Sequence, residues 1–176
     1  RELIVEHKDG RSALGKRYSE ATTQSKPQMA ANMIKRATRC GIEAVYVIAD
    51  AWFGTKSMMR TALGLEMCAI LRMKKSKMKY RAVIKGRKKE LLNAQELYTC
   101  VVKREWKKVR GLPWKAVSLD VELDLAEDDE KAPRWQAVRL LFVRGLKESS
   151  EADAGKKDWA LFLTTDVHLS MSKMLE

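Results

Sequence analysis

Several features that would point to common protein classes are scarce in this chain of 176 residues. The cysteines Cys40, Cys68 and Cys100 are odd in number and widely spaced, which argues against a disulfide framework or a zinc site and favours a reducing, cytoplasmic compartment. His7 and His168 have no cysteine or acidic residue at a spacing typical of a metal motif, so both are expected at the surface. No glycine-rich phosphate loop occurs either.

Long apolar runs are also missing. No run approaches the roughly 18 residues that a membrane span requires, and no targeting segment is visible, so no membrane partner is expected. The composition, 45% hydrophobic and 33% charged, is typical of a soluble globular protein with one domain, or with one domain that carries an insertion. The chain begins with Arg1, and residues 168–176 resemble a helix that is just beginning. We therefore expect an internal fragment of a longer protein.

Acidic residues are scarce in one segment, and this makes the charge distribution uneven. The formal net charge is +12, and residues 72–110 contain 15 basic and 3 acidic residues, which leaves 20 of each sign elsewhere. The whole basic excess therefore lies in this segment. Such a concentration is typical of binding to a phosphate backbone. A solvated, lysine-rich surface or an acidic protein partner would also account for it.

The most informative stretch is residues 44–54, which read Ala-Val-Tyr-Val-Ile-Ala-Asp-Ala-Trp-Phe-Gly. An unbroken apolar run rich in Val and Ile favours a strand that is buried on both faces, as in the parallel part of an α/β sheet. The run ends at Asp50, and such sheets bind ligands at the carboxyl ends of their strands. Asp is also a common helix cap and turn former, so a structural role for Asp50 remains open.

The first hundred residues indicate alternating helices and strands around this stretch. Residues 1–24 show no sustained period and are expected to form a basic connector with a strand at residues 3–6. Ser25 is expected to cap a helix that has Pro27 in its first turn and ends at Gly41. The other predicted elements are a helix over residues 56–63 closed by Gly64, a strand over residues 67–73, and a helix over residues 94–98 that begins with a capping box of Asn93 and Glu96.

The later part of the chain is predicted to be rich in antiparallel strands. Residues 117–125 alternate apolar and polar side chains, which describes a strand with one buried face and one acidic solvent face. An exposed face of this kind accounts for its three carboxylates without a metal site. A turn and a polar loop, residues 127–133 and 147–157, separate this strand from two more, over residues 135–143 and 159–165.

This order of features resembles the insertion-sequence DDE transposases, whose catalytic domain has a ribonuclease H-like fold. In that family the second catalytic Asp ends a buried strand and is soon followed by an aromatic residue and often a Gly, as in residues 47–54. A strand and a Lys-rich stretch come next, as in Ala-Ile-Leu-Arg-Met-Lys-Lys-Ser-Lys at residues 69–77. A β-rich insertion then precedes a strand of the form Trp-x-Leu-x-Leu-Thr-Thr/Ser, matched by residues 159–165.

The resemblance implies an α/β fold with a partial ribonuclease H-like core and an antiparallel β-rich insertion. It places the middle of the core in residues 1–66, the basic insertion in residues 67–157, and the last core strand with the start of a helix in residues 158–176. The family's first Asp would precede Arg1, and its Y-x-x-R-W-x-x-E helix would follow Glu176. One of three catalytic carboxylates is therefore expected here, and the fragment is expected to be inactive alone.

The resemblance also implies site residues, a cofactor and partners. Asp50 would be the catalytic residue and a ligand of two Mg²⁺ ions that activate a water or a DNA 3′-hydroxyl for in-line attack on a phosphodiester. The implied partners are transposon-end and target DNA, and the complete protein would be a homodimer. Trp159 matches a family Trp that holds a flipped base, although a Trp at the head of a strand is also ordinary core. The implied contacts to DNA phosphates are Lys74, Lys75, Lys77, Lys79, Arg81, Arg87, Lys88 and Lys89.

Two other functions remain open on the sequence. The first is a non-catalytic nucleic-acid-binding module, in which the basic segment is functional and Asp50 is a structural cap. The second is a different Mg²⁺-dependent phosphotransfer enzyme on an α/β sheet. The absence of a second acidic residue near Asp50 in the sequence weighs against this second possibility.

Overall fold

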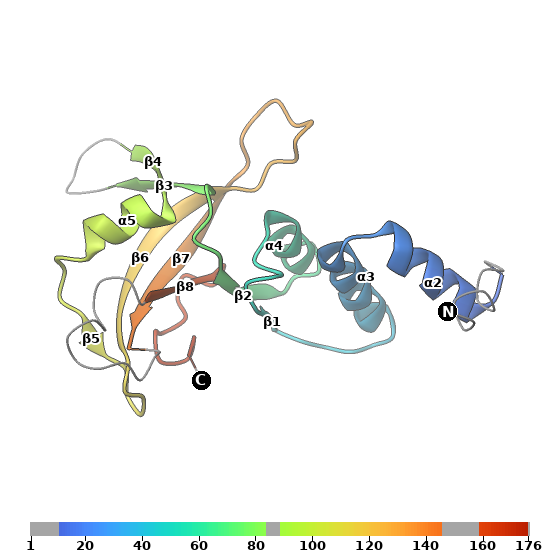
Figure 1. Cartoon of the computed structure of the whole chain (residues 1–176), viewed down its shortest axis with the longest axis horizontal. Coiled ribbons are helices and arrows are strands. Elements are labelled where there is room, and N and C mark those ends of the chain that lie inside the picture. Colours follow the sequence, from blue (N-terminus) through green and yellow to red (C-terminus); the bar gives the residue numbers. More distant parts are fainter. Residues whose placement is uncertain (1–10, 84–88, 146–158, 176) are drawn as a thin grey trace. The chain divides into compact units, whose positions relative to one another are not determined.

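The computed structural model describes residues 11–83, 89–145 and 159–175. Contacts divide the chain into two compact units, residues 1–43 and 44–176. In the described part of the first unit there are two helices, and in that of the second there is a β-sheet with two further helices (Figure 1). None of the described helices combines the length and the apolar character needed to span a bilayer.

The first unit begins with helix α2 (Ala13–Thr23), which corrects the connector expected over residues 1–24. The Ser12 hydroxyl accepts a hydrogen bond from the Gly15 N–H at 2.9 Å and so caps the helix. At the other end, the Thr23 hydroxyl donates to a carbonyl of the helix itself. The hydroxyl residues that suggested a loop therefore form hydrogen bonds with backbone groups near the helix ends. The strand expected at residues 3–6 lies outside the described residues.

Helix α3 (Lys26–Arg39) confirms the predicted helix and its boundaries. It begins with a capping box, in which the Ser25 N–H donates to the Gln28 side chain at 2.8 Å, and Pro27 occupies the first turn. Gly41 follows the helix in the left-handed region at φ +82°, a conformation that glycine adopts without a Cβ penalty.

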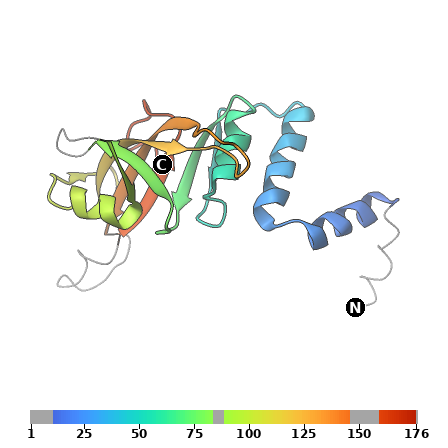
Figure 2. The same cartoon turned by 90° about the horizontal axis from the view of Figure 1, so that it is seen from above.

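In its described residues the second unit contains one mixed sheet of eight strands in the order β1-β2-β8-β7-β6-β3-β4, with β5 paired to β6 (Figures 1 and 2). Strands β1 and β2 are parallel, and the other pairs are antiparallel. The expected α/β class is confirmed. The strands are β1 Tyr46–Ala49, β2 Cys68–Met73, β3 Lys79–Val83, β4 Lys89–Asn93, β5 Lys107–Lys108, β6 Lys115–Asp124, β7 Trp135–Arg144 and β8 Trp159–Thr164, and the helices are α4 Lys56–Leu63 and α5 Ala94–Val101.

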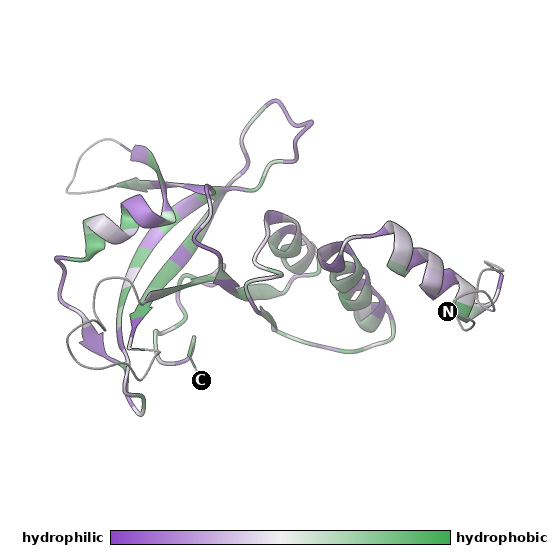
Figure 3. Ribbon diagram, in the orientation of Figure 1, coloured by the Kyte–Doolittle hydropathy of each residue, from purple (hydrophilic) through white to green (hydrophobic). Residues whose placement is uncertain are grey.

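Core residues lie on both faces of the sheet. Leu119, Val121 and Leu123 of β6 are buried on the face that α5 covers, as the period of two predicts, and apolar and polar residues alternate along β6 (Figure 3). Tyr98 of α5 packs against Phe142 of β7 on this face. On the opposite face Ala116, Leu141 and Val143 pack with Val109 and Met174. The predicted helices over residues 56–63 and 94–98 and the hairpin strands are all confirmed.

Strand β1 differs from its prediction in one respect. Its parallel pairing with β2 agrees with expectation, but β1 forms an edge of the sheet. Ile48 is 75% exposed and the preceding Val45 is 70% exposed, so the expectation of a strand buried on both faces is wrong in this structure. An apolar run indicates only that the side chains of a strand are compatible with burial. Whether they are buried depends on the neighbouring elements, and the described sheet places only β2 beside β1.

Two further segments show detail that the sequence did not specify or predicted differently. Strands β3 and β4 pair antiparallel within the expected basic, β-rich insertion, at residues to which the sequence analysis had assigned no strands. At the other end of the chain, residues 167–175 form turns instead of the start of a helix. One bond of helical spacing, from the Met174 N–H to the Ser170 carbonyl at 3.1 Å, remains from the predicted pattern.

Gly54 lets the loop after β1 lie directly against the end of β2. A Cβ atom at this position would be 2.5 Å from the carbonyl oxygen of Arg72 and 3.1 Å from the sulfur of Met73. Because that carbonyl belongs to the sheet backbone, it cannot move aside as a flexible side chain would. Gly54 therefore fixes how closely the loop that carries Asp50 approaches β2.

We expect Gly54→Ala to lower the free energy of unfolding by about 1–3 kcal/mol, the usual cost of overpacking a fixed site. Gly64→Ala is the matched control, because Gly64 has an ordinary helical φ of −68° and a Cβ there would be 3.1 Å from the nearest atom. Urea unfolding measures both. If Gly54→Ala lowers the free energy of unfolding no more than the control does, the close approach of Gly54 to the Arg72 carbonyl is contradicted.

A hydrogen bond ties β1 to the segment after β8. The Tyr46 hydroxyl donates to Asp166 Oδ2 at 2.8 Å, and the His168 N–H donates to Asp166 Oδ1 at 2.9 Å. The hydrogen bond from Tyr46 is the main cause of a lowered Asp166 pKa, and the bond from the His168 N–H lowers it further. The same bond to Asp166 raises the pKa of Tyr46. The contact gives the edge strand β1 a second attachment besides β2.

Tyr46→Phe should therefore reduce stability in a way that depends on pH. The contribution of Asp166 is present above its ordinary pKa of 3.8 and is lost as the pH falls through its lower folded pKa. The contribution of Tyr46 is present below its ordinary pKa of 10.0 and is lost as the pH rises through its higher folded pKa. Denaturant unfolding at several pH values should show the largest difference in the free energy of unfolding between variant and wild type at pH values between these two pKa ranges. A difference that is the same at all pH values would rule out the coupling between this hydrogen bond and the two titrations.

Candidate nucleic-acid and catalytic site

Asp50 follows β1 directly and is exposed at the carboxyl end of the strand. Its Oδ1 accepts a hydrogen bond from the Trp52 N–H at 2.9 Å, and its carbonyl accepts from the Phe53 N–H at 3.1 Å. Asp50 therefore shapes the turn, as an Asp in this position commonly does. Within the described ranges its second carboxylate oxygen has no hydrogen bond or ion pair, so it is available to a ligand.

Strand pairing brings other predicted site residues to the same end of the sheet. Because β2 is parallel to β1, Lys74 and Lys75 leave β2 at the end where Asp50 leaves β1. Strand β8 is antiparallel to β2, with Leu161 opposite Met73, so β8 begins at this end with Trp159. Residues that lie more than one hundred positions apart in the sequence thus share one edge.

The two lysines after β2 lie over aromatic rings. Lys74 Nζ is 4.4 Å from the centre of the Trp52 ring, and Lys75 Nζ is 4.1 Å from that of Trp159. Cations at these distances are attracted by the negative face of the ring. The start of the basic segment is thereby held beside the loop of Asp50.

Trp159 is packed as a core residue. It is 4% exposed, and its ring stacks on Tyr98 of α5 at 4.3 Å between centroids with an interplanar angle of 6°. The parallel Tyr98 ring covers one face of the indole, and the Lys75 ammonium lies over the ring as well. A nucleic-acid base would therefore stack on Trp159 only after Lys75 moves away.

The remaining basic residues predicted to contact DNA fall into two groups. Lys77 and Lys79 are exposed at the start of the β3–β4 hairpin. Arg81 and Lys89 instead share one carboxylate, with Arg81 Nε 2.7 Å and Lys89 Nζ 3.0 Å from Glu122 Oε2, and the bond from Arg81 is the main cause of a lowered Glu122 pKa. Predicted contacts that fall outside the described residues are Arg87 and Lys88.

The carboxylates on the polar face of β6 have separate partners. Asp120 binds the Arg139 guanidinium with both oxygens, at 2.6 and 2.9 Å. Asp124 accepts the N–H groups of Ala126 and Arg134, at 2.9 and 2.8 Å, and these bonds lower its pKa against the opposing effect of desolvation. Among residues 11–83, 89–145 and 159–175, no three His, Cys, Asp or Glu side chains converge as metal ligands.

An arginine held by aromatic residues was missed by the sequence analysis. Arg144 ends β7, and its Nε donates to the Tyr98 hydroxyl at 2.7 Å. Its guanidinium lies 4.0 Å from the centre of the Trp106 ring. No short motif joins residues separated by 38 or more positions, so only the strand register and the position of α5 reveal this cluster.

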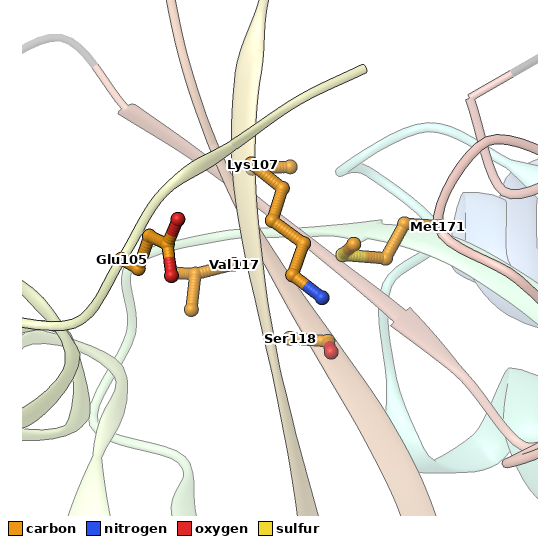
Figure 4. A pocket seen from close by; sticks show the side chains of 6 residues that line it. Glu105, Lys107, Val117, Ser118 and Met171 are labelled. Carbon is orange, nitrogen blue, oxygen red and sulfur yellow. The ribbon is translucent and has the colours of Figure 1, made fainter. Parts of the chain in front are cut away.

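A pocket of about 220 Å³ lies between the β5–β6 hairpin and the C-terminal segment (Figure 4). The pocket is lined by Glu105, Lys107, Ala116, Val117, Ser118 and Met171. One carboxylate, one ammonium and one hydroxyl provide neither a metal-ligand set nor a nucleophile with its base. We therefore assign the pocket no role in catalysis.

Comparison with known proteins identifies the class of this domain. Residues 5–91 match a family model described as DDE superfamily endonuclease, and this span includes Asp50, α4, β2 and the first part of the basic segment. No curated protein and no solved structure matched the chain. Helices with an eight-stranded mixed sheet are consistent with a partial ribonuclease H-like fold of the DDE type. The match over residues 5–91 therefore supports a DDE-type, transposase-like domain in this chain.

Proposed function

We propose that this chain is part of an insertion-sequence DNA transposase that cuts and joins DNA ends, with Asp50 as one of its catalytic carboxylates. The observation that supports this proposal is the position of Asp50. It is exposed at the carboxyl end of β1, with one oxygen available, inside the span that matches the DDE family. Basic and aromatic residues lie beside it, as a DNA-processing site requires.

Proteins of this superfamily typically use a divalent metal ion, and Mg²⁺ prefers oxygen ligands. Asp50 offers one such ligand, but the part of the chain that the structure describes supplies no cluster that would complete the site. The described residues therefore fit one coordination position of a metal centre. We propose that the complete site holds two Mg²⁺ ions with the help of carboxylates outside these residues, and that the isolated chain is inactive. When bound, the ions would activate the attacking hydroxyl and stabilise the leaving oxygen.

The exposed edge of β1 supports the proposal that the domain is incomplete. Ile48 of β1 and the preceding Val45 are exposed, and among the described residues β1 pairs only with β2, so the hydrogen-bonding groups on its other side have no strand partner there. A further strand paired here would bury those side chains. If that strand were parallel to β1, its carboxyl end would lie beside Asp50, where the family's first catalytic Asp would be expected.

We assign different weights to the predicted DNA contacts. Lys74 and Lys75 are exposed directly after β2 at its Asp50 end, and Lys77 and Lys79 are exposed further along the chain. All four are proposed to bind phosphates, together with Arg87 and Lys88. Arg81 and Lys89 share Glu122, which reduces their net charge, and would contribute less. A base-stacking role of Trp159 requires displacement of Lys75. We further propose transposon-end and target DNA as partners, a homodimer for the complete protein, and a cytoplasmic location.

In the full-length protein, Asp50→Asn should abolish Mg²⁺-dependent cleavage and joining of DNA ends, because a neutral amide oxygen binds Mg²⁺ much more weakly than a carboxylate does. The amide oxygen can still accept the Trp52 N–H, so the turn and the DNA affinity should be retained. A gel assay with labelled ends measures cleavage and joining.

Asp129→Asn is the matched control, since it makes the same chemical change in an exposed turn. It should keep full activity, and both variants should unfold at the wild-type temperature. Cleavage at the wild-type rate by Asp50→Asn would remove Asp50 from the catalytic site.

A non-catalytic nucleic-acid-binding module is the second candidate function. The observation that favours it is the turn in which Asp50 already uses one oxygen to accept the Trp52 N–H. In that case DNA affinity would not depend on Mg²⁺, and Asp50→Ala in the full-length protein would leave every activity unchanged. Titration of DNA with and without Mg²⁺ distinguishes the two functions.

Neutralising the lysines beside Asp50 tests the DNA partner directly. Lys74→Gln with Lys77→Gln should weaken DNA binding, and the slope of log K against log salt should fall by about 0.9 for each lost phosphate contact. Lys131→Gln with Lys173→Gln removes the same charge from exposed positions elsewhere and should change affinity much less. Fluorescence anisotropy at several salt concentrations measures both, and equal losses for the two pairs would contradict a localised contact.

A further inference from the structure

A row of basic residues crosses the sheet at the end where Trp159 lies. The register places Lys108 of β5 opposite Lys115 of β6, Lys115 opposite Arg144 of β7, and Arg144 opposite Trp159 of β8. Directly opposite residues on neighbouring strands point to the same face of a sheet. The row therefore continues, through Trp159, to Lys75, which lies over the Trp159 ring.

The lysines of this row are not explained by the stability of the fold. Like charges directly opposite each other destabilise a strand pair, and Lys108 and Lys115 are opposite and exposed. No ion pair is found for either lysine among the described residues. Arg81 and Lys89, by contrast, are joined by a carboxylate between them. An anionic ligand would provide the compensation that the Lys108 and Lys115 pair lacks.

Arg144 has the geometry of a preorganised anion-binding group. Its guanidinium is held against the Trp106 ring, and its Nε is occupied by the Tyr98 hydroxyl. Its two terminal nitrogens make no hydrogen bond within the described ranges. A planar guanidinium fixed in this way can bind two oxygens of one phosphate, with little further loss of side-chain freedom.

The dimensions of the row fit a nucleic-acid backbone. Neighbouring strands are about 4.8 Å apart, so the four steps from Lys108 to Lys75 cover roughly 19 Å. One nucleic-acid strand presents a phosphate about every 3.4 Å along a duplex axis, so roughly five phosphates pass over such a length. Several phosphates could therefore contact the row at once, which a single small anion could not do.

We propose that Arg144, Lys115 and Lys108 form a second DNA-backbone contact, which guides the DNA across the sheet toward the loop of Asp50. This inference rests on the proposed function, because it takes DNA as the partner. It adds residues of β5, β6 and β7 to those predicted near β2 and β3. The contact is sequence-independent, because it reads phosphates and no base edges.

Two variants of this chain test the contact, with labelled DNA of arbitrary sequence as the probe, in single-stranded and in duplex form. Lys108→Gln with Lys115→Gln should weaken binding at least fivefold and lower the salt slope by about 1.8 for duplex DNA, from two lost contacts. The melting temperature of this variant should stay the same or rise, since a repulsion is removed. Arg144→Lys keeps the positive charge but loses the two guanidinium nitrogens that can bind one phosphate together. It should therefore weaken binding at least threefold, with little change in the slope of log K against log salt.

Lys131→Gln with Lys173→Gln is the matched control and should bind within twofold of wild type. If the Lys108 and Lys115 variant binds like this control while the Lys74 and Lys77 variant is weakened, the second contact is wrong and the proposed DNA partner stands. If wild type binds neither form of DNA, the proposed DNA partner fails together with the second contact. The DNA form for which the Lys108 and Lys115 variant loses more affinity identifies the form that the row holds.

Discussion

The pairing of β2 with β1 on one side and β8 on the other is the constraint on which the site depends. Parallel pairing with β1 sets Lys74 and Lys75 beside Asp50, and antiparallel pairing with β8 brings Trp159 to the same end. Gly54 closes this arrangement, because only a residue without a Cβ lets the loop after β1 contact the carbonyl of Arg72. The position of the carboxylate thus follows from backbone hydrogen bonds and one close approach, both of which are rigid compared with side chains.

Aromatic residues then fix the directions of the cations around this end. Lys75 is held over Trp159, whose other contacts are the stacked Tyr98 ring and the core, and Arg144 is held between Tyr98 and Trp106. Burial of the rings provides their stability through apolar area, while their faces attract cations. The same rings therefore contribute to the core of the sheet and orient the cations at its edge, so that the buried Trp159 also fixes the position of Lys75.

The sequence predicted most of the local structure and suggested part of the candidate site. Capping boxes at Ser25 and Asn93 and the alternation along β6 were sufficient, because each depends on neighbours in the chain. The exposure of Ile48 was not predictable, because it depends on which strands lie beside β1. Arg144 was missed for a similar reason, since its aromatic partners are distant in the sequence. Asp50 could be proposed from the sequence because an apolar run that ends in a carboxylate is a local pattern.

The basic segment also shows why a count of charges cannot locate a binding surface. Arg81 and Lys89 contribute to the excess of positive charge, yet Glu122 lies between them and gives them a structural function in the β3, β4 and β6 strands. Lys108 and Lys115 face each other without such a carboxylate in the described residues, and Arg144 extends their row although it lies outside the basic segment. Uncompensated like charge in a fixed geometry costs stability, so its presence indicates a ligand more strongly than the net charge does.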